Sequence, residues 1–277
     1  MQKERRMRLF SRRNKIPASE PTVVKRLMSY QVANLQGIGA RESQEDSFAF
    51  VNAMDVTRIR DNGLFAVLAD GMGGMLDGKK VSEAAVAVLL EEFDRMDRQQ
   101  DLGRQLRESV YRADSQLYGW FGGSGGTTLT ACIFFEEKLY FASVGDSFLY
   151  LKRGNGIYRL NREQTYRQTL YLRQIEEGRL TPEYADRDPD AARLSEFLGS
   201  GSLGEIDGFQ QPWTLHNGDL LLLCSDGIGG ILTERELFGC LEEPAPEQAC
   251  KRMEQEIQKR GCVYQDNYTA LVISCKY

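Results

Sequence analysis

The chain has 277 residues, of which 42% are hydrophobic and 10% aromatic, a composition typical of a globular protein rather than a disordered or fibrous one. It carries a formal net charge of −5 and a single histidine, His216. One histidine excludes zinc sites that need two or three, and a histidine-based triad would have to use His216. If the chain is an enzyme, we expect its chemistry to depend on carboxylates.

Positive charge is concentrated at the start of the chain. Residues 1–26 hold nine Lys and Arg and two Glu, a net charge of +7, so the other residues together carry −12. An acidic body argues against a nucleic-acid-binding domain. We expect residues 1–28 to form a basic, disordered segment because they lack a sustained apolar face; contact with a membrane surface or an acidic partner is the alternative.

The sequence predicts a cytoplasmic protein. No apolar stretch of signal-peptide length follows the basic start, and no run approaches the ~18 apolar residues that a transmembrane helix needs. The six cysteines are widely spaced and form no CxxC pair, which disfavours a zinc ribbon or a thioredoxin-type site. Cys132, Cys224 and Cys275 lie in apolar runs, as reduced cysteines in a core do.

The first half predicts a strand followed by two helices. The first ordered piece is expected at 29–39. The run GLFAVLA at 63–69 is bounded by Gly and Asp-Gly, which indicates a buried strand. Apolar residues then recur with helical period over 81–96 and 102–120.

The second half begins with short strands. Four runs rich in β-branched and aromatic residues predict an antiparallel meander: 127–135, 138–144, 147–152 and 156–160. The polar stretch 165–198 is expected to be an exposed excursion from the sheet. A strand, two helices and a last strand follow at 219–225, 233–241, 246–259 and 270–275. This order predicts an α+β domain in which helix pairs cover antiparallel sheets.

Five aspartates lie at predicted strand ends: Asp46, Asp70, Asp146, Asp226 and Asp266. Any one of them could be only a turn residue. However, Asp70 and Asp226 open near-identical Asp-Gly-x-Gly-Gly units directly after apolar strands, where an uncompensated charge is costly. If these strands are neighbours, their acids converge at one rim.

Converging carboxylates can stay ionised together only around cations, and an all-oxygen cluster suits Mg²⁺ or Mn²⁺ rather than zinc. Two such ions ~3.5–4 Å apart can activate a water for attack on phosphorus. Arg41, four residues before Glu45, is the candidate for binding the phosphate because its guanidinium matches phosphate oxygens. The alternative for Arg41 is an ordinary surface salt bridge.

Six motifs in order resemble the PPM/PP2C family of metal-dependent serine/threonine phosphatases, in its bacterial form, over residues 29–277. They are R-x-x-x-E-D at Arg41, Glu45 and Asp46, then DGMGG at 70–74, GGTTL at 125–129, VGDS at 144–147, SDG at 225–227 and DN at 266–267. The stretch 178–185 is similar to the family's flap, so 165–198 is interpreted as a flap-like insertion. The resemblance implies a four-layer α/β/β/α sandwich with two central antiparallel sheets.

The resemblance also implies a metal site at Glu45, Asp46, Asp70, Gly71, Asp146, Asp226 and Asp266. Asp70 would bridge two Mn²⁺ or Mg²⁺ ions, with the Gly71 carbonyl contributing to one. Asp226 and Asp266 would complete the second ion's ligands. Glu45 would orient water on the first ion and Asp46 would support it, while Asp146 would belong to a third, weaker site. Arg41 would bind the substrate phosphate, so Arg41, Asp70 and Asp226 are the expected catalytic residues.

Two positions, Gly230 and Gln164, depart from the family pattern, whereas Met72 is shared with many bacterial relatives. Gly230 stands where an acid usually completes the third site, so the resemblance supports two ions and would leave a third to Asp226, Asp146 and water. Gln164 replaces a histidine that many bacterial members have beside the flap. Met72 stands where some members carry a histidine general acid, so protonation of the leaving group would fall to a water or another group. His216, in a predicted turn, is interpreted as structural.

These features predict a monomeric protein phosphatase acting on phosphoserine and phosphothreonine in proteins, the products of a Ser/Thr kinase. A non-catalytic phosphoprotein-binding regulatory module on the same fold is the second hypothesis, motivated by Gly230 and Gln164. A phosphatase for small phosphorylated metabolites is the third, and a deep, closed pocket would favour it.

Overall fold

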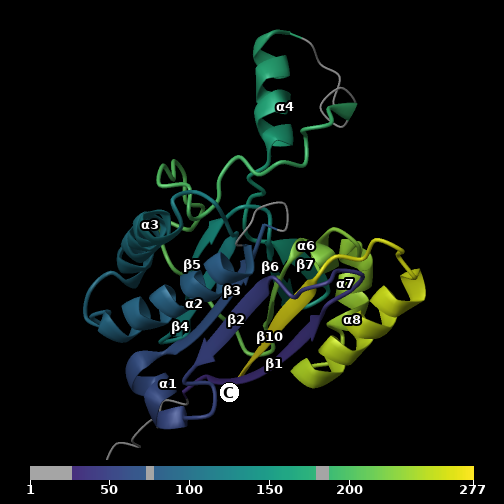
Figure 1. Ribbon diagram of the computed structural model, residues 1–277. Helices are drawn as coiled ribbons and strands as arrows, with labels where there is room; N and C mark the ends of the chain where they lie inside the picture. The colour runs from purple at the N-terminus through teal and green to yellow at the C-terminus, as the bar shows by residue number, and fades with distance from the viewer. Residues whose placement is uncertain (1–26, 73–77, 179–186) are drawn as a thin grey trace, which may run out of the picture.

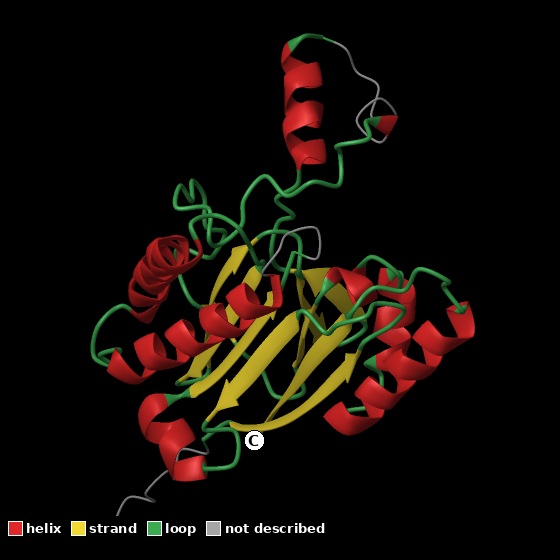
Figure 2. Cartoon of the chain, in the orientation of Figure 1, coloured by secondary structure: helices red, strands yellow, loops and turns green. Residues whose placement is uncertain are grey.

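Two antiparallel five-stranded sheets stack face to face, and helices cover their outer faces (Figures 1 and 2). The computed structural model describes residues 27–72, 78–178 and 187–277. The arrangement confirms the predicted α+β class and the four layers that the resemblance implies.

The two sheets have different strand orders. The first has the order β1-β10-β9-β6-β7, with β1 (Ser29–Gly37), β6 (Phe148–Arg153), β7 (Gly156–Arg159), β9 (Leu220–Cys224) and β10 (Tyr268–Lys276). The second has the order β2-β3-β4-β5-β8, with β2 (Asp46–Val51), β3 (Leu64–Asp70), β4 (Leu129–Phe135), β5 (Lys138–Val144) and β8 (Trp213–Thr214).

Each sheet has its own pair of covering helices (Figure 1). The second sheet packs against α2 (Gly78–Arg95) and α3 (Leu102–Phe121), and the first packs against α7 (Glu234–Cys240) and α8 (Pro246–Arg260). Shorter or separate helices are α1 (Val56–Asn62), α4 (Tyr166–Glu176) and α6 (Asp226–Gly229). None of the helices in the described parts of the chain is long and apolar enough to cross a membrane.

Burial on both faces explains why the strands are apolar throughout. In β3, Leu64 and Leu68 lie between the two sheets, whereas Phe65 and Val67 belong to the core beneath α2 and α3. Successive side chains of a strand point to opposite faces, so a strand with two buried faces needs apolar residues at every position. Cys132, in β4, is likewise fully buried between the sheets, as predicted.

The predicted four-stranded meander is wrong. After the β4–β5 hairpin, the chain crosses at Gly145 and Asp146 to the other sheet, where β6 and β7 form a second hairpin. Gly145 has φ +96°, a backbone conformation that glycine adopts without steric cost. The local turn signal is the same for a hairpin and a crossover, so the sequence could not tell which sheet each strand joins. The crossover places Asp146 at the end of both sheets.

The predicted excursion leaves the sheets after β7 and carries α4, which stands away from the body of the protein (Figure 1). Residues 179–186, which hold most of the flap-like stretch, lie outside the described residues. Residues 1–26 of the predicted N-terminal segment also lie outside them.

Candidate functional site

The five predicted aspartates lie at the same end of the two stacked sheets. Asp46 opens β2 and is paired with Asp70, the last residue of β3. Asp226 is the first residue of α6, one residue after β9, with Ser225 as the N-cap of the helix, and Asp266 lies just before β10. Strand pairing brings Asp46 to Asp70 in one sheet and places the β9 and β10 ends side by side in the other. Because β3 and β9 belong to different sheets, the stacking of the sheets, and not the pairing of these two strands, brings Asp70 and Asp226 together.

A cavity of about 210 Å³ joins the predicted site residues. It is lined by seven of the eight: Arg41, Glu45, Asp70, Gly71, Asp146, Asp226 and Asp266. Asp46 does not line the cavity but is buried beside Asp70. Thr128 and the segment 192–194 also line it. Arg193 lies in the excursion, and no local sequence pattern pointed to it as a site residue.

Two threonines fix the backbone of Asp70. The Asp70 amide donates to Thr128 Oγ1 at 3.1 Å, and Thr127 Oγ1 donates to the Asp70 carbonyl at 2.8 Å. Gly71 follows in a space without room for a side chain, because a Cβ there would lie 2.6 Å from the Gly78 carbonyl oxygen. The GGTT and DG motifs therefore hold the strand end that presents the Asp70 carboxylate.

Asn267 holds the loop that carries Arg41 and Glu45. Its Oδ1 accepts a hydrogen bond from the Glu45 amide at 2.8 Å, and its Nδ2 donates to the carbonyls of Ile38 and Ser43, both at 2.9 Å. The side chain is buried, so these bonds are formed away from water. The sequence marked this residue only as the second half of the DN motif.

Asp46 is a buried carboxylate with one free oxygen. Its Oδ2 accepts hydrogen bonds from Ser225 Oγ at 2.9 Å and Thr269 Oγ1 at 2.6 Å, whereas Oδ1 has no hydrogen-bond partner among the described residues. Burial raises the pKa of Asp46 to about 6 although the two hydroxyl groups lower it. A buried acceptor without a donor is costly, so this position favours a bound cation or water.

Like charges raise the pKa values of the other acids. Burial, followed by the charges of the four other aspartates, raises the pKa of Asp70 well above its usual range. Burial and Asp226 raise the pKa of Asp146 to about 7, and burial and Asp266 raise the pKa of Asp226. Without a compensating cation, the site therefore retains protons near neutral pH.

The donor set fits a hard divalent cation. The cavity presents carboxylate and carbonyl oxygens, which Mg²⁺ and Mn²⁺ prefer, and Asp46, whose Oδ1 has no partner among the described residues, is buried beside it. In the described parts of the chain, no three acidic, histidine or cysteine side chains are already drawn into a closed ligand set. Instead, Arg41 Nη2 lies 2.5 Å from Asp266 Oδ2 and neutralises one of the acids.

Gln164 connects the Asp146 loop to the base of the excursion. Its Oε1 accepts from the Gly145 amide at 2.8 Å, and its Nε2 donates to the Glu205 carbonyl at 3.0 Å. Its backbone amide also donates to the Gly145 carbonyl at 3.0 Å. Its backbone carbonyl accepts from the amide of Ser195, in the excursion, at 2.9 Å. The glutamine at the position expected for histidine therefore links the Asp146 loop to both Glu205 and the excursion.

His216 is far from the acids. It lies in the turn before β9, and its backbone amide donates to Asp219 Oδ2 at 2.7 Å. Asp226 follows the other end of the same strand. The position agrees with a structural role for the turn.

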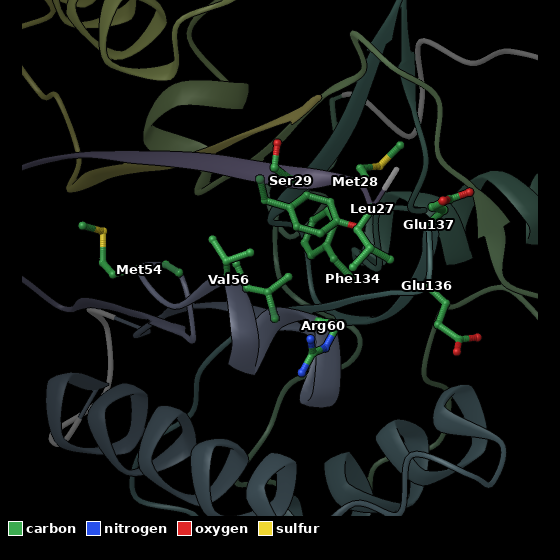
Figure 3. A pocket seen from close by; sticks show the side chains of 12 residues that line it. Leu27, Met28, Ser29, Met54, Val56, Arg60, Phe134, Glu136 and Glu137 are labelled. Atoms are coloured by element: carbon green, nitrogen blue, oxygen red, sulfur yellow. The ribbon is translucent and has the colours of Figure 1, made fainter. Parts of the chain in front are cut away.

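A larger apolar pocket of about 370 Å³ lies beside β1, α1 and the turn between β4 and β5. Figure 3 shows side chains that line it. Its walls include Met28, Val56 and Phe134, with Arg60, Glu136 and Glu137 at its edge. Its only acids among the described lining residues are Glu136 and Glu137, and it borders the strand ends remote from Asp70. This pocket is therefore not the candidate active site.

Comparison with known proteins places the chain among phosphatases. A family model described as Protein phosphatase 2C matches residues 39–260. Serine/threonine phosphatase stp of Listeria welshimeri is 30% identical over 191 residues, which cover 66% of this chain and 73% of that protein. Serine/threonine protein phosphatase PstP of Mycobacterium tuberculosis is 28% identical over 214 residues, or 74% of this chain, and the match spans only 39% of PstP.

A solved structure has the same fold. The crystal structure of the catalytic domain of PstP in complex with two manganese ions superimposes with a TM-score of 0.71 and 27% sequence identity. The match covers 90% of this chain and 100% of that domain.

Proposed function

The chain belongs to the protein phosphatase 2C family, and from this premise we propose that it hydrolyses phosphoserine and phosphothreonine in proteins with the help of Mn²⁺ or Mg²⁺. The observation that carries the proposal is the convergence of Arg41 and the acidic side chains on one cavity. The phosphatase domain would comprise residues 29–277, with the excursion at 165–198 beside the site.

The groups around the cavity have different proposed roles toward the ions. Asp70 and the Gly71 carbonyl would hold the ions together with Asp226 and Asp266, and Glu45 would orient water. Asp46, held by Ser225 and Thr269, would support that water from behind. Bound divalent ions supply a water of lowered pKa and neutralise phosphate charge.

Two further groups at the cavity, Arg41 and Met72, bear on how the substrate is bound and how its leaving group is protonated. Arg41 would hold the phosphate oxygens, because its guanidinium can donate two parallel hydrogen bonds to them. Met72 lines the cavity at the position where some family members carry a histidine, and a thioether cannot donate a proton. Protonation of the leaving oxygen would therefore fall to water.

The size of the cavity favours protein substrates over small metabolites. At about 210 Å³ in the described residues, it is smaller than the ~300–1,000 Å³ of typical small-molecule pockets. It can take a phosphorylated side chain whose protein remains outside. A Ser/Thr kinase would supply such substrates.

The direct test is the hydrolysis rate of a phosphothreonine peptide with and without Mn²⁺. We expect turnover only with the ion, and His216→Ala should leave it nearly unchanged because that residue lies at the far end of β9. Metal-independent turnover would contradict the proposal. No binding of Mn²⁺ in calorimetry would favour the regulatory module instead.

Acidic pH is expected to weaken Mn²⁺ binding on the order of tenfold between pH 7.5 and 5.5. Asp46 has a pKa of about 6 and Asp70 a pKa well above its usual range, so protons compete with the ion below neutral pH. Each pH unit below the pKa of a required carboxyl costs about a factor of ten. Calorimetry in buffers of different ionisation enthalpy should also show proton release on binding.

The raised pKa values of these carboxyl groups also decide whether the metal-free protein becomes more or less stable as the pH rises. A carboxyl whose pKa is higher in the folded state loses its stabilising contribution as pH rises through that pKa. The metal-free protein should therefore lose this contribution between about pH 4 and pH 7. The rise in Tm caused by Mn²⁺ should be larger at pH 7.5 than at pH 5.5, and the reverse order would contradict the assignment.

A further inference from the structure

Arg193 brings a second guanidinium to the cavity that holds Arg41 and the acids. It lines that cavity together with its neighbours Ala192 and Leu194. The Arg193 side chain is 74% exposed, whereas that of Arg41 is 48% exposed. A side chain that borders a cavity and is still mostly exposed belongs to the mouth of the cavity rather than to its floor. Arg193 is therefore placed to meet groups that approach the site from outside.

The backbone at Arg193 is fixed to the base of the excursion. The Tyr166 amide donates to the Arg193 carbonyl at 2.7 Å. Two residues before Tyr166, Gln164 is bonded to both the amide and the carbonyl of Gly145. Gly145 directly precedes Asp146, which lines the same cavity. A short series of hydrogen bonds therefore joins the backbone of Arg193 to the loop that carries Asp146, and it holds the residue at the cavity.

The Asp-Pro-Asp sequence before Arg193 folds into two consecutive turns. The Ala191 amide donates to the Asp188 carbonyl at 3.0 Å, as expected when a proline follows the first residue of a turn. The Arg193 amide then donates to the Asp190 carbonyl at 2.9 Å. These turns bring the Asp190 carboxylate within 3.5 Å of Arg193 Nη1, but both side chains are mostly exposed. Exposed ion pairs contribute little free energy, so another anion can take the place of Asp190.

We propose that Arg193 binds an anionic side chain next to the phosphorylated residue of the substrate, and that the protein therefore prefers phosphosites flanked by acidic residues. The inference rests on the proposed function, because it presupposes that the cavity takes a phosphorylated side chain. The phosphate would lie deeper, at Arg41 and the acids, so the cation at the mouth meets the residues on either side. A carboxylate and a second phosphate both match the paired donors of a guanidinium.

The test is kcat/KM with Mn²⁺ for three phosphothreonine peptides that differ only beside the phosphothreonine. The flanking residues are alanine, aspartate, or a phosphonate analogue of phosphoserine that cannot be hydrolysed. We expect at least one anionic peptide to be preferred over the alanine peptide by about fivefold, the upper range for an exposed ion pair. The aspartate and phosphonate peptides together show which anion is bound.

Variants assign the preference to one side chain. Arg193→Gln should reduce the anionic peptides to the level of the alanine peptide, and Arg193→Glu should make them poorer substrates than the alanine peptide. Arg104→Gln is the matched control, because Arg104 is 77% exposed, is paired with Glu108 on α3 and does not line the cavity. It removes the same charge and should keep the preference. The inhibition constant of inorganic phosphate should rise in Arg41→Ala and not in Arg193→Gln.

The outcomes separate the two proposals. Turnover without a preference for either anionic peptide, or a preference that survives in Arg193→Gln, would overturn the inference and leave the phosphatase in place. An equal loss on all three peptides with weaker inhibition by phosphate would also overturn it, because Arg193 would then bind the phosphate itself. No turnover of any peptide would overturn the proposed function and the inference with it. If Arg193→Gln does not fold, Arg193→Glu decides: reversal of the preference supports the inference, and its retention overturns it.

Discussion

Asp70→Asn is expected to lower Mn²⁺-dependent turnover of a phosphothreonine peptide by at least about 10³-fold. Asp70 is surrounded by four other aspartates, each of which raises its pKa or that of a neighbour. Asparagine keeps the shape but removes the negative charge with which Asp70 would bind the ions. Metal ions contribute several kcal/mol to such reactions, and about 1.36 kcal/mol corresponds to tenfold in rate.

Thermal unfolding distinguishes loss of the ion site from loss of the fold. Because Asp70 is repelled by its neighbours in the metal-free form, Asp70→Asn should unfold at an equal or higher temperature without Mn²⁺. The increase in Tm caused by Mn²⁺ should then be small. Asp101→Asn is a control, since Asp101 only caps α3 and asparagine caps about as well. Full activity of Asp70→Asn would refute the assignment of the site.

The local sequence was sufficient to predict the elements whose faces are buried. The apolar run of β3 and the helical periods of α2 and α3 are properties of consecutive residues, and the structure contains all three elements close to their expected bounds. β2 was not predicted, because its mixed sequence DSFAFV indicates a strand only when β3 is available to pair with it. α1 was not predicted either, because its sequence VTRIRDN has no apolar face.

The candidate site was predictable in its residues but not in its geometry. Strand–Asp-Gly units identified Asp70 and Asp226, and the resemblance supplied the others. The contacts that hold them, such as Asn267 to the loop at Ser43 and Thr269 to Asp46, join residues more than 200 positions apart. No periodicity or spacing encodes such contacts. Arg193 was missed for the same reason, since only the fold of the excursion brings it to the cavity.

Arg41→Ala is expected to raise KM for a phosphopeptide by about 10²-fold. Hydrogen bonds to a charged group contribute about 1.5–3 kcal/mol each, and Arg41 would make two to the phosphate. In the structure its Nη2 lies 2.5 Å from Asp266 Oδ2, and the side chain is about half exposed, so it can exchange the acid for a phosphate. Arg41→Lys should recover only part of the loss, because lysine keeps the charge but not the paired donors.

The ion pair with Asp266 predicts an opposite effect on metal binding. Arg41 is paired with Asp266 and would compete with a cation for it, so Arg41→Ala should bind Mn²⁺ as tightly as the unaltered protein or more tightly. Arg58→Ala, which removes an exposed arginine paired with Asp55, should change neither KM nor Mn²⁺ affinity. A variant at Arg41 that lost substrate and metal binding together would indicate a damaged loop. A selective loss of substrate binding follows only if Arg41 faces the phosphate.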